Sequence, residues 1–128
     1  MQPRIEQELA LLRRYYPDLV WRDEGQWILL PRCSLPANWS AQEVPICFQV
    51  PPGYAGTPPY GFHVPASLAF DGNALQNATN PSKTPFDGTW QMLSWTHLDD
   101  WRPTANLETG SNLWGWCRGF AERFRSGR

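Results

Sequence analysis

The segment from Pro51 to Pro65 constrains the fold of this chain more than any other part of the sequence. It reads PPGYAGTPPYGFHVP and holds five prolines and three glycines around Tyr54, Tyr60 and Phe62. Proline lacks the backbone N–H that helix interiors and central strands need, and glycine weakens both kinds of element. Aromatic side chains at this density indicate an ordered loop packed on a core. We expect the last residues, GFHVP, to return as a final, edge-like strand.

Amphipathic helices are predicted at both ends of the chain. Their apolar positions recur at offsets of three or four, seven and eleven residues, which is the period of one helix face. The first stripe comprises Ile5, Leu9, Leu12 and Tyr16, and the second comprises Leu113, Trp116, Cys117, Phe120 and Phe124. Pro17 ends the first helix, which packs on the core or, alternatively, binds a partner. Cys117 lies on the apolar stripe and behaves as a small buried residue.

Strand patterns fill the region between the first helix and the proline-rich segment. Residues 19–33, LVWRDEGQWILLPRC, predict two strands around a turn at Glu24 and Gly25. In residues 44–50 the apolar side chains alternate, so that Cys47 and Gln49 occupy the face opposite Val44 and Ile46. Residues 71–88 are polar and rich in Asn, Pro, Ser and Thr, and we expect an irregular region over about residues 71–100. Strands bracketed by helices favour an α+β fold.

Composition and charge exclude several classes of function. The chain of 128 residues predicts a single domain, residues 1–128, and its net charge of −1 disfavours nucleic acid and anionic membranes as partners. No apolar run reaches the length of a membrane span, and the N-terminal residues lack the pattern of a signal peptide. Three scattered cysteines match neither a disulfide framework nor a zinc site. We therefore expect a cytoplasmic protein without a metal or another cofactor.

Two groups of motif residues give the chain a resemblance to a known superfamily. The first group joins the proline-rich segment to a later Trp-Arg-Pro motif and comprises Pro51, Tyr54, Pro58, Pro59, Phe62, Trp101 and Pro103. In this respect the chain resembles the ubiquitin-conjugating enzyme (UBC-like) superfamily. The second group resembles the bacterial branch called prokaryotic family E and comprises Gly88, Trp90, Gln91, Ser94, His97, Trp101, Arg102 and Pro103. The resemblance implies an N-terminal helix, a four-stranded antiparallel meander, a long irregular crossover and a C-terminal helix.

The chain departs from that superfamily at the reactive residue. The position of the thioester-forming cysteine falls on Leu93, and the upstream His-Pro-Asn signature is reduced to Asn80-Pro81. The three cysteines lie elsewhere: Cys33 at the end of a predicted strand, Cys47 within a strand and Cys117 on a helix. None of them corresponds to the reactive position, so any covalent chemistry here requires another nucleophile.

Ser94 and His97 are the candidate catalytic residues. A serine hydroxyl becomes nucleophilic only beside a base, and the His97 imidazole three residues later supplies one. Asp99 or Asp100 is placed to orient the imidazole. The alternative interpretation is that His97 is a structural residue whose ring is satisfied by a backbone carbonyl.

The resemblance implies a component of a bacterial ubiquitin-like protein conjugation pathway. Such a protein docks to a ubiquitin-activating-enzyme-like protein and guides transfer of the ubiquitin-like protein, either without a thioester or through an oxyester. Aromatic side chains of the two motif regions are the expected partner-binding residues: Tyr54, Tyr60, Trp95 and Trp101. One alternative is a non-catalytic adaptor of the same fold. Another is a tryptophan-rich module that binds a ligand by stacking, suggested by the eight tryptophans.

Overall fold

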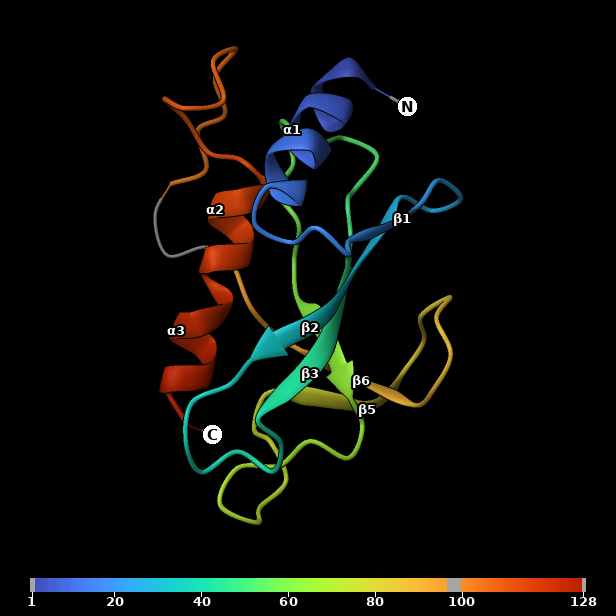
Figure 1. The fold of residues 1–128 in the computed structure, drawn as a ribbon, viewed down its shortest axis with the longest axis vertical. Coiled ribbons are helices and arrows are strands. Elements are labelled where there is room, and N and C mark those ends of the chain that lie inside the picture. The colour runs from blue at the N-terminus through green and yellow to red at the C-terminus, as the bar shows by residue number, and fades with distance from the viewer. Residues whose placement is uncertain (1, 97–99, 128) are drawn as a thin grey trace.

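The computed structural model describes residues 2–96 and 100–127 as an antiparallel sheet with helices on one face (Figure 1). The chain is therefore α+β, as the sequence predicts, with helical segments at both ends. In chain order the elements are α1 (Pro3–Arg13), β1 (Val20–Arg22), β2 (Trp27–Ser34), β3 (Glu43–Gln49), β4 (Phe62–Pro65), β5 (Ala78–Ser82), β6 (Trp90–Leu93), α2 (Leu113–Arg118) and α3 (Phe120–Arg125). No helix in this described part of the chain is long and apolar enough to cross a membrane.

The sheet has six strands, so the prediction of a four-stranded meander is wrong. Its order is β1-β2-β3-β4-β6-β5, with every neighbouring pair antiparallel. The two strands around Glu24-Gly25 and the strand over residues 44–50 are confirmed as β1, β2 and β3. The GFHVP segment forms β4, but it is an interior strand rather than an edge, because β6 pairs with its free side.

The expected irregular region over residues 71–100 contains the two additional strands. β5 pairs with β6 in the register Ala78↔Leu93 and Thr79↔Met92, with an irregularity before Ser82. β5 is mostly exposed and polar, and Pro81 lies within it. A proline is tolerated here because an edge strand has one side without a partner strand. Such a strand carries little of the apolar alternation by which strands are recognised, which explains why the sequence pattern did not reveal it.

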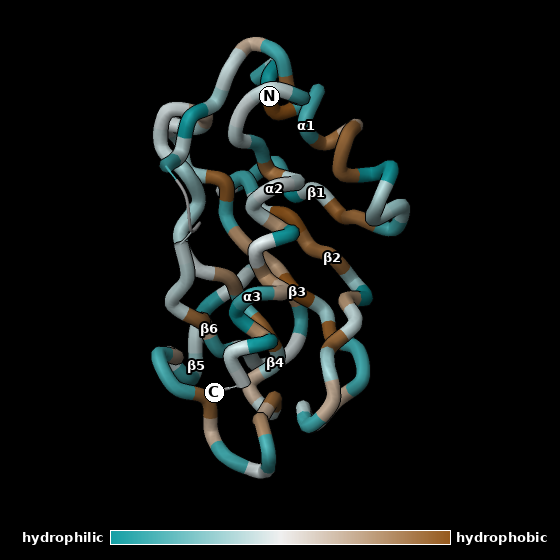
Figure 2. Tube along the Cα trace, turned by 90° about the vertical axis from the view of Figure 1, so that its left-hand side faces the viewer, coloured by the Kyte–Doolittle hydropathy of each residue, from teal (hydrophilic) through white to brown (hydrophobic). Residues whose placement is uncertain are grey.

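The helix-covered face of the sheet forms the main core. Side chains that alternate along β2, β3, β4 and β6 meet the apolar sides of the helices there; the buried residues are Ile5, Leu9, Leu12, Ile28, Leu30, Ile46, Phe48, Phe62, Val64, Leu93, Leu113, Trp116, Cys117, Phe120 and Phe124. Phe120 is central, with its ring 4.2 Å from that of Phe62 and 5.9 Å from that of Phe48, measured between centroids. Figure 2 shows hydrophobic residues along α1, β2 and β3, and mostly hydrophilic ones in the connecting loops.

The predicted C-terminal helix is divided into α2 and α3 at Gly119. Its apolar stripe is nevertheless buried, which confirms the expected position of Cys117. Gly119 lies close to the indole of Trp95: a Cβ added to it would be 3.3 Å from Trp95 Nε1 and 3.1 Å from the Trp116 carbonyl oxygen. Glycine at this position therefore allows the segment after β6 to pack closely on the C-terminal helices.

The opposite face is covered by a loop, residues 83–88, and we call it the loop-covered face. Cys47 lies on this face, as predicted, yet it is fully buried. Phe86 from the loop packs edge-on against Trp27 at a centroid distance of 6.4 Å. The Trp90 indole N–H is 3.2 Å from the carbonyl oxygens of Phe86 and Asp87 and donates to them. These contacts hold the loop against the sheet.

Candidate functional site

The proline-rich segment packs directly on the Trp-Arg-Pro motif. The rings of Tyr54 and Trp101 lie 5.9 Å apart, tilted by 60°, and the Trp101 indole N–H donates to the Ala55 carbonyl oxygen at 2.7 Å. Tyr54 is only 4% exposed. The prediction of an ordered loop pinned to the core is confirmed, and two motifs far apart in the sequence form one junction.

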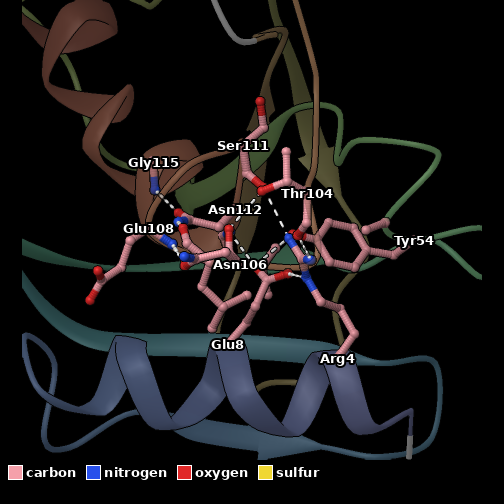
Figure 3. Close-up of polar contacts among 12 residues, drawn as sticks. Arg4, Glu8, Tyr54, Thr104, Asn106, Glu108, Ser111, Asn112 and Gly115 are labelled. Carbon is pink, nitrogen blue, oxygen red and sulfur yellow. Dashed lines mark hydrogen bonds and ion pairs between the residues drawn. The ribbon is translucent and has the colours of Figure 1, made fainter.

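A buried carboxylate completes this junction (Figure 3). Glu8 of α1 is fully buried and accepts hydrogen bonds from the Tyr54 hydroxyl at 2.7 Å and the Leu113 backbone N–H at 2.5 Å. The Arg4 guanidinium donates to the other carboxylate oxygen at 2.6 Å and also to the carbonyl oxygens of Thr104 and Ser111. A buried charge is tolerated because each oxygen has a donor. Glu8 thereby joins α1, the proline-rich segment and the start of α2.

The network gives one predicted partner-binding residue an internal contact. Burial raises the pKa of the Tyr54 phenol well above its ordinary value, and the negative charge of Glu8 adds to this rise. Tyr54 is therefore a neutral internal donor, and its contact with a partner stays a prediction. Sequence analysis missed Glu8 because it considered only the apolar residues of the stripe. The spacing Arg4–Glu8, with Glu8 beside Leu9 and Leu12, is the signal that points to it.

Leu93 and Ser94 differ sharply in exposure. Leu93, at which the sequence resemblance predicts the reactive position, is fully buried at the end of β6, opposite Phe62. Ser94 is exposed, and its backbone N–H donates to the Asn77 carbonyl oxygen at 2.9 Å. Only Ser94 of these two presents its side chain to a second molecule.

The proposed partner of Ser94, His97, lies outside the described residues, as does Asp99. The Ser94–His97 pair therefore stays a prediction. Asp100, the other candidate for orienting the imidazole, is exposed and forms an ion pair with Arg102 at 3.0 Å. Within the described parts of the chain, no side chain forms a hydrogen bond with the Ser94 hydroxyl.

The remaining aromatic candidates differ in exposure. Tyr60 is 64% exposed, whereas Trp95 and Trp101 are half-buried. The Gly61 N–H donates to the Trp95 carbonyl oxygen at 2.8 Å, so the segments that carry Tyr60 and Ser94 run side by side.

Each of the eight tryptophans is buried or half-buried. This arrangement disfavours a module that stacks ligands on exposed indoles. Of the four predicted partner-binding residues, Tyr60 is the exposed one.

The three cysteines are unsuited to thioester chemistry. Burial raises the pKa of the Cys33 thiol to about 12. Burial likewise raises the pKa of Cys47 to about 12, although its interaction with Thr84 partly offsets this rise, and burial holds the pKa of Cys117 well above the ordinary value. The thiolate is the reactive form of cysteine, and it is scarcely populated near neutral pH at any of these positions. No group of residues in the described ranges is arranged to hold a metal ion.

The structure brings together a different serine and histidine on the loop-covered face. His63 of β4 and Ser82 of β5 are joined by a hydrogen bond of 2.8 Å between Nδ1 and Oγ. Sequence analysis did not single out either residue. Their pairing depends on β6, which lies between the two strands, and no local pattern encodes that placement.

A surface near the end of α1 offers a second candidate site. Tyr15 is 50% exposed and stacks on Trp114 at a centroid distance of 4.4 Å, with the Arg118 guanidinium 4.5 Å from the Trp114 ring. Two open cavities, of about 750 and 400 Å³, share Tyr15, Gly115 and Arg118 in their walls. Exposed aromatic and arginine side chains beside cavities are typical of protein interfaces.

Comparisons with protein-family models, with curated proteins and with solved structures found no match for this chain.

Proposed function

We propose that this chain is a UBC-like component of a bacterial ubiquitin-like protein conjugation pathway that works without a catalytic cysteine. It docks to a ubiquitin-activating-enzyme-like protein in the cytoplasm and guides transfer of the ubiquitin-like protein. The observation that carries this proposal is the junction in which Tyr54 and Ala55 meet Trp101. The two motifs on which the resemblance depends come together in space, between a leading helix, an antiparallel sheet and closing helices.

The surroundings of Leu93 and Ser94 support a role without a thioester. A buried leucine occupies the reactive position, and the thiols of the chain are protonated by burial. A protein with these features assists transfer by holding the activating enzyme and the ubiquitin-like protein close together, because proximity alone lowers the barrier to reaction between bound partners.

Two surfaces suit the two partners. The surface of Tyr15, Trp114 and Arg118 is assigned to the activating enzyme, because it combines aromatic rings, a cation and adjacent cavities. The surface of Tyr60 and Ser94 is assigned to the tail of the ubiquitin-like protein, because it adjoins the position of the superfamily's reactive residue.

A cysteine introduced at Ser94 tests whether the tail of the ubiquitin-like protein is held at this surface. The Ser94→Cys protein is mixed with a bacterial ubiquitin-activating-enzyme-like protein, ATP and the ubiquitin-like protein that this enzyme activates, and adducts are resolved with and without a reducing thiol. We expect a thiol-labile adduct on this variant. The matched control is Ser67→Cys, since Ser67 is an equally exposed serine beyond the other end of β4. Adducts on both variants, or on neither, contradict the proposal.

The docking surface is tested by Tyr15→Ala in a titration against the activating enzyme. Truncation of an interface anchor costs about 2 kcal/mol or more, so we expect affinity to fall at least about 30-fold. Val20→Ala is the control, because Val20 is similarly exposed at 43% but belongs to β1. Binding that survives both substitutions unchanged places the docking surface elsewhere.

A non-catalytic adaptor of the same fold is the second candidate. It is favoured by the burial of Leu93, the residue at which the resemblance predicts the reactive position. An adaptor binds the activating enzyme through the same surface and forms no adduct even as Ser94→Cys. The two experiments together therefore separate a guide for transfer from an adaptor.

A further inference from the structure

The loop-covered face holds a hydroxyl and an imidazole in direct contact. His63 Nδ1 and Ser82 Oγ lie 2.8 Å apart, although β6 separates their strands. The placement follows from register, because His63 lies opposite Met92 and Ser82 opposite Trp90 on the same central strand. Each side chain reaches across β6 to meet the other. The pairing of β4 and β5 with β6 thus sets the positions of His63 and Ser82 relative to each other.

The two members of this pair differ in their access to solvent. His63 is 8% exposed, and its ring lies 5.4 Å from that of Trp27. Burial lowers the pKa of His63 to about 4, so the ring is neutral near neutral pH. Ser82 is half-buried between the exposed residues Pro81 and Lys83. A buried, neutral imidazole therefore contacts the hydroxyl of a half-buried serine.

A neutral imidazole is the form that accepts a proton. With the ring proton on Nε2, Nδ1 accepts the hydrogen bond from the Ser82 hydroxyl and can take its proton as a nucleophilic attack begins. A free serine hydroxyl is a weak nucleophile, and an adjacent base is what activates it. Ser94 has no such partner among the described residues, whereas Ser82 has one in place.

We infer that Ser82, with His63 as its general base, is a nucleophile that accepts an activated acyl group from a thioester or an activated ester. This inference rests on the proposed function for the identity of the acyl donor, the thioester of the ubiquitin-like protein on its activating enzyme. It places covalent chemistry on the loop-covered face and leaves the Ser94 surface to hold the partner.

The step conserves atoms and charge. Ser82 Oγ attacks the thioester carbonyl carbon, and the hydroxyl proton moves to His63 Nδ1. The tetrahedral intermediate collapses with cleavage of the C–S bond, and the departing sulfur takes the proton from His63. The products are an oxyester on Ser82, a free thiol on the donor and a neutral His63, so no oxidant, reductant or metal is needed.

The test uses p-nitrophenyl acetate with the intact protein at neutral pH, followed by mass spectrometry of the whole chain and of its peptides. We expect acetylation at Ser82 that is absent in Ser82→Ala. Because burial lowers the pKa of His63 to about 4, it is a weaker base than an imidazole with a pKa near 7, and His63→Gln should slow acetylation of Ser82 by about tenfold, less than the 100-fold or more of a well-matched general base. Ser67→Ala is the matched control, because Ser67 is an exposed serine outside both proposed sites, and it should be acetylated at the same rate as the parent protein.

Two outcomes overturn the inference: acetylation confined to lysines, the N-terminal amine or Ser94, and acetylation of Ser82 at an unchanged rate in His63→Gln. Near-UV circular dichroism checks that His63→Gln is folded. If it is not, the decision rests on Ser82→Ala, which removes one hydroxyl from a half-buried edge position. Because this assay contains no activating enzyme, its failure is distinct from failure of the docking experiments. If Ser82 is acetylated but the protein does not bind the activating enzyme, the inference about Ser82 is supported and the proposed function is contradicted.

Discussion

The two faces of the sheet are built on different principles. The helix-covered face is a continuous layer of aliphatic and aromatic side chains, with Phe120 in contact with the rings of Phe48 and Phe62. The loop-covered face mixes aromatic rings with a thiol, an imidazole and hydroxyls under residues 83–88. Burial on the first face stabilises the fold, whereas burial on the second changes the chemistry of polar groups. The two sides of the sheet thus differ in what they bury: mainly apolar side chains on one, and a polar pair, His63 and Ser82, on the other.

The largest effect is expected on the helix-covered face. Phe120→Ala removes a ring that contacts three others and leaves a cavity that short helices cannot close, which costs about 3–5 kcal/mol in the free energy of unfolding. Urea denaturation followed by tryptophan fluorescence measures the loss. Val20→Ala, at an exposed position of β1, should stay within about 0.5 kcal/mol of the parent. A comparable loss in both variants would contradict the assignment of the main core to this face.

On the loop-covered face the expected effect depends on pH. Burial lowers the pKa of His63 from its ordinary value of 6.5 to about 4, so between these values the unfolded chain binds a proton that the folded chain does not. The stability contributed by neutral His63 is complete above pH 6.5. It is lost as the pH falls toward 4, by a total on the order of 3 kcal/mol.

The measurement is the free energy of unfolding between pH 7 and pH 4 for the parent protein and for His63→Gln. We expect the variant to lose less stability over this window, because it has no imidazole at this position to protonate on unfolding. The two proteins differ only at residue 63, so the difference between the two curves isolates His63. Parallel curves would show that the ring is not held neutral by burial.

The Glu8 network should show a smaller effect. Tyr54→Phe removes the hydroxyl that donates to the buried Glu8 carboxylate but keeps the ring against Trp101. A hydrogen bond to a charged group is worth about 1.5–3 kcal/mol, and we expect a loss of that size in urea denaturation. Tyr60→Phe is the control, because Tyr60 is 64% exposed. Equal stability of the two variants would mean that the Arg4 guanidinium and the Leu113 N–H stabilise the buried Glu8 carboxylate without the Tyr54 hydroxyl.

The helix-covered face is also the part of the molecule that the sequence predicts well. Its apolar residues recur with the helical period in the helices and with the strand period in β2 and β3. Each period depends only on residues close together in the sequence, so it can be recognised without the structure. Ile5, Leu9 and Leu12 are buried as their spacing predicts, and so are Val44, Ile46 and Phe48. The α+β class follows from these elements alone.

The loop-covered face and the Glu8 network depend on contacts between distant residues. Glu8 meets Tyr54 and Leu113, and His63 meets Ser82, only after the chain has folded. β5 is polar at the sheet edge and shows no apolar alternation, so neither its pairing nor the interior position of β4 was evident. Polar groups buried by tertiary structure leave no periodic trace in the sequence, which is why sequence analysis did not single out the contact between His63 and Ser82.

The smallest effect distinguishes a loop that merely rests on the sheet from one that controls access to it. Phe86→Leu keeps most of the apolar area of the loop but removes its edge-on contact with Trp27, at a cost of about 0.5–1.5 kcal/mol. If residues 83–88 open locally, loss of this contact lowers the free energy of opening. A decrease of about 1 kcal/mol raises the population of the open state about fivefold. The reporter is alkylation of Cys47 by iodoacetamide, located by peptide mass spectrometry. Phe70→Leu, which removes a similar contact with Trp39, is the control and should leave Cys47 unchanged.

The cysteine that is alkylated faster distinguishes local opening of the loop from unfolding of the whole domain. Cys47 lies beneath residues 83–88, whereas Cys117 lies among the helices, so local opening of the loop affects Cys47 alone. Increased alkylation of both residues would mean that Phe86→Leu promotes unfolding of the whole domain. The loop would then not open separately from the rest of the domain. An increase confined to Cys47 means that residues 83–88 separate from the sheet while the helix-covered face stays intact. The same motion would uncover His63 and Ser82 to a second molecule, because both lie on the face that the loop covers.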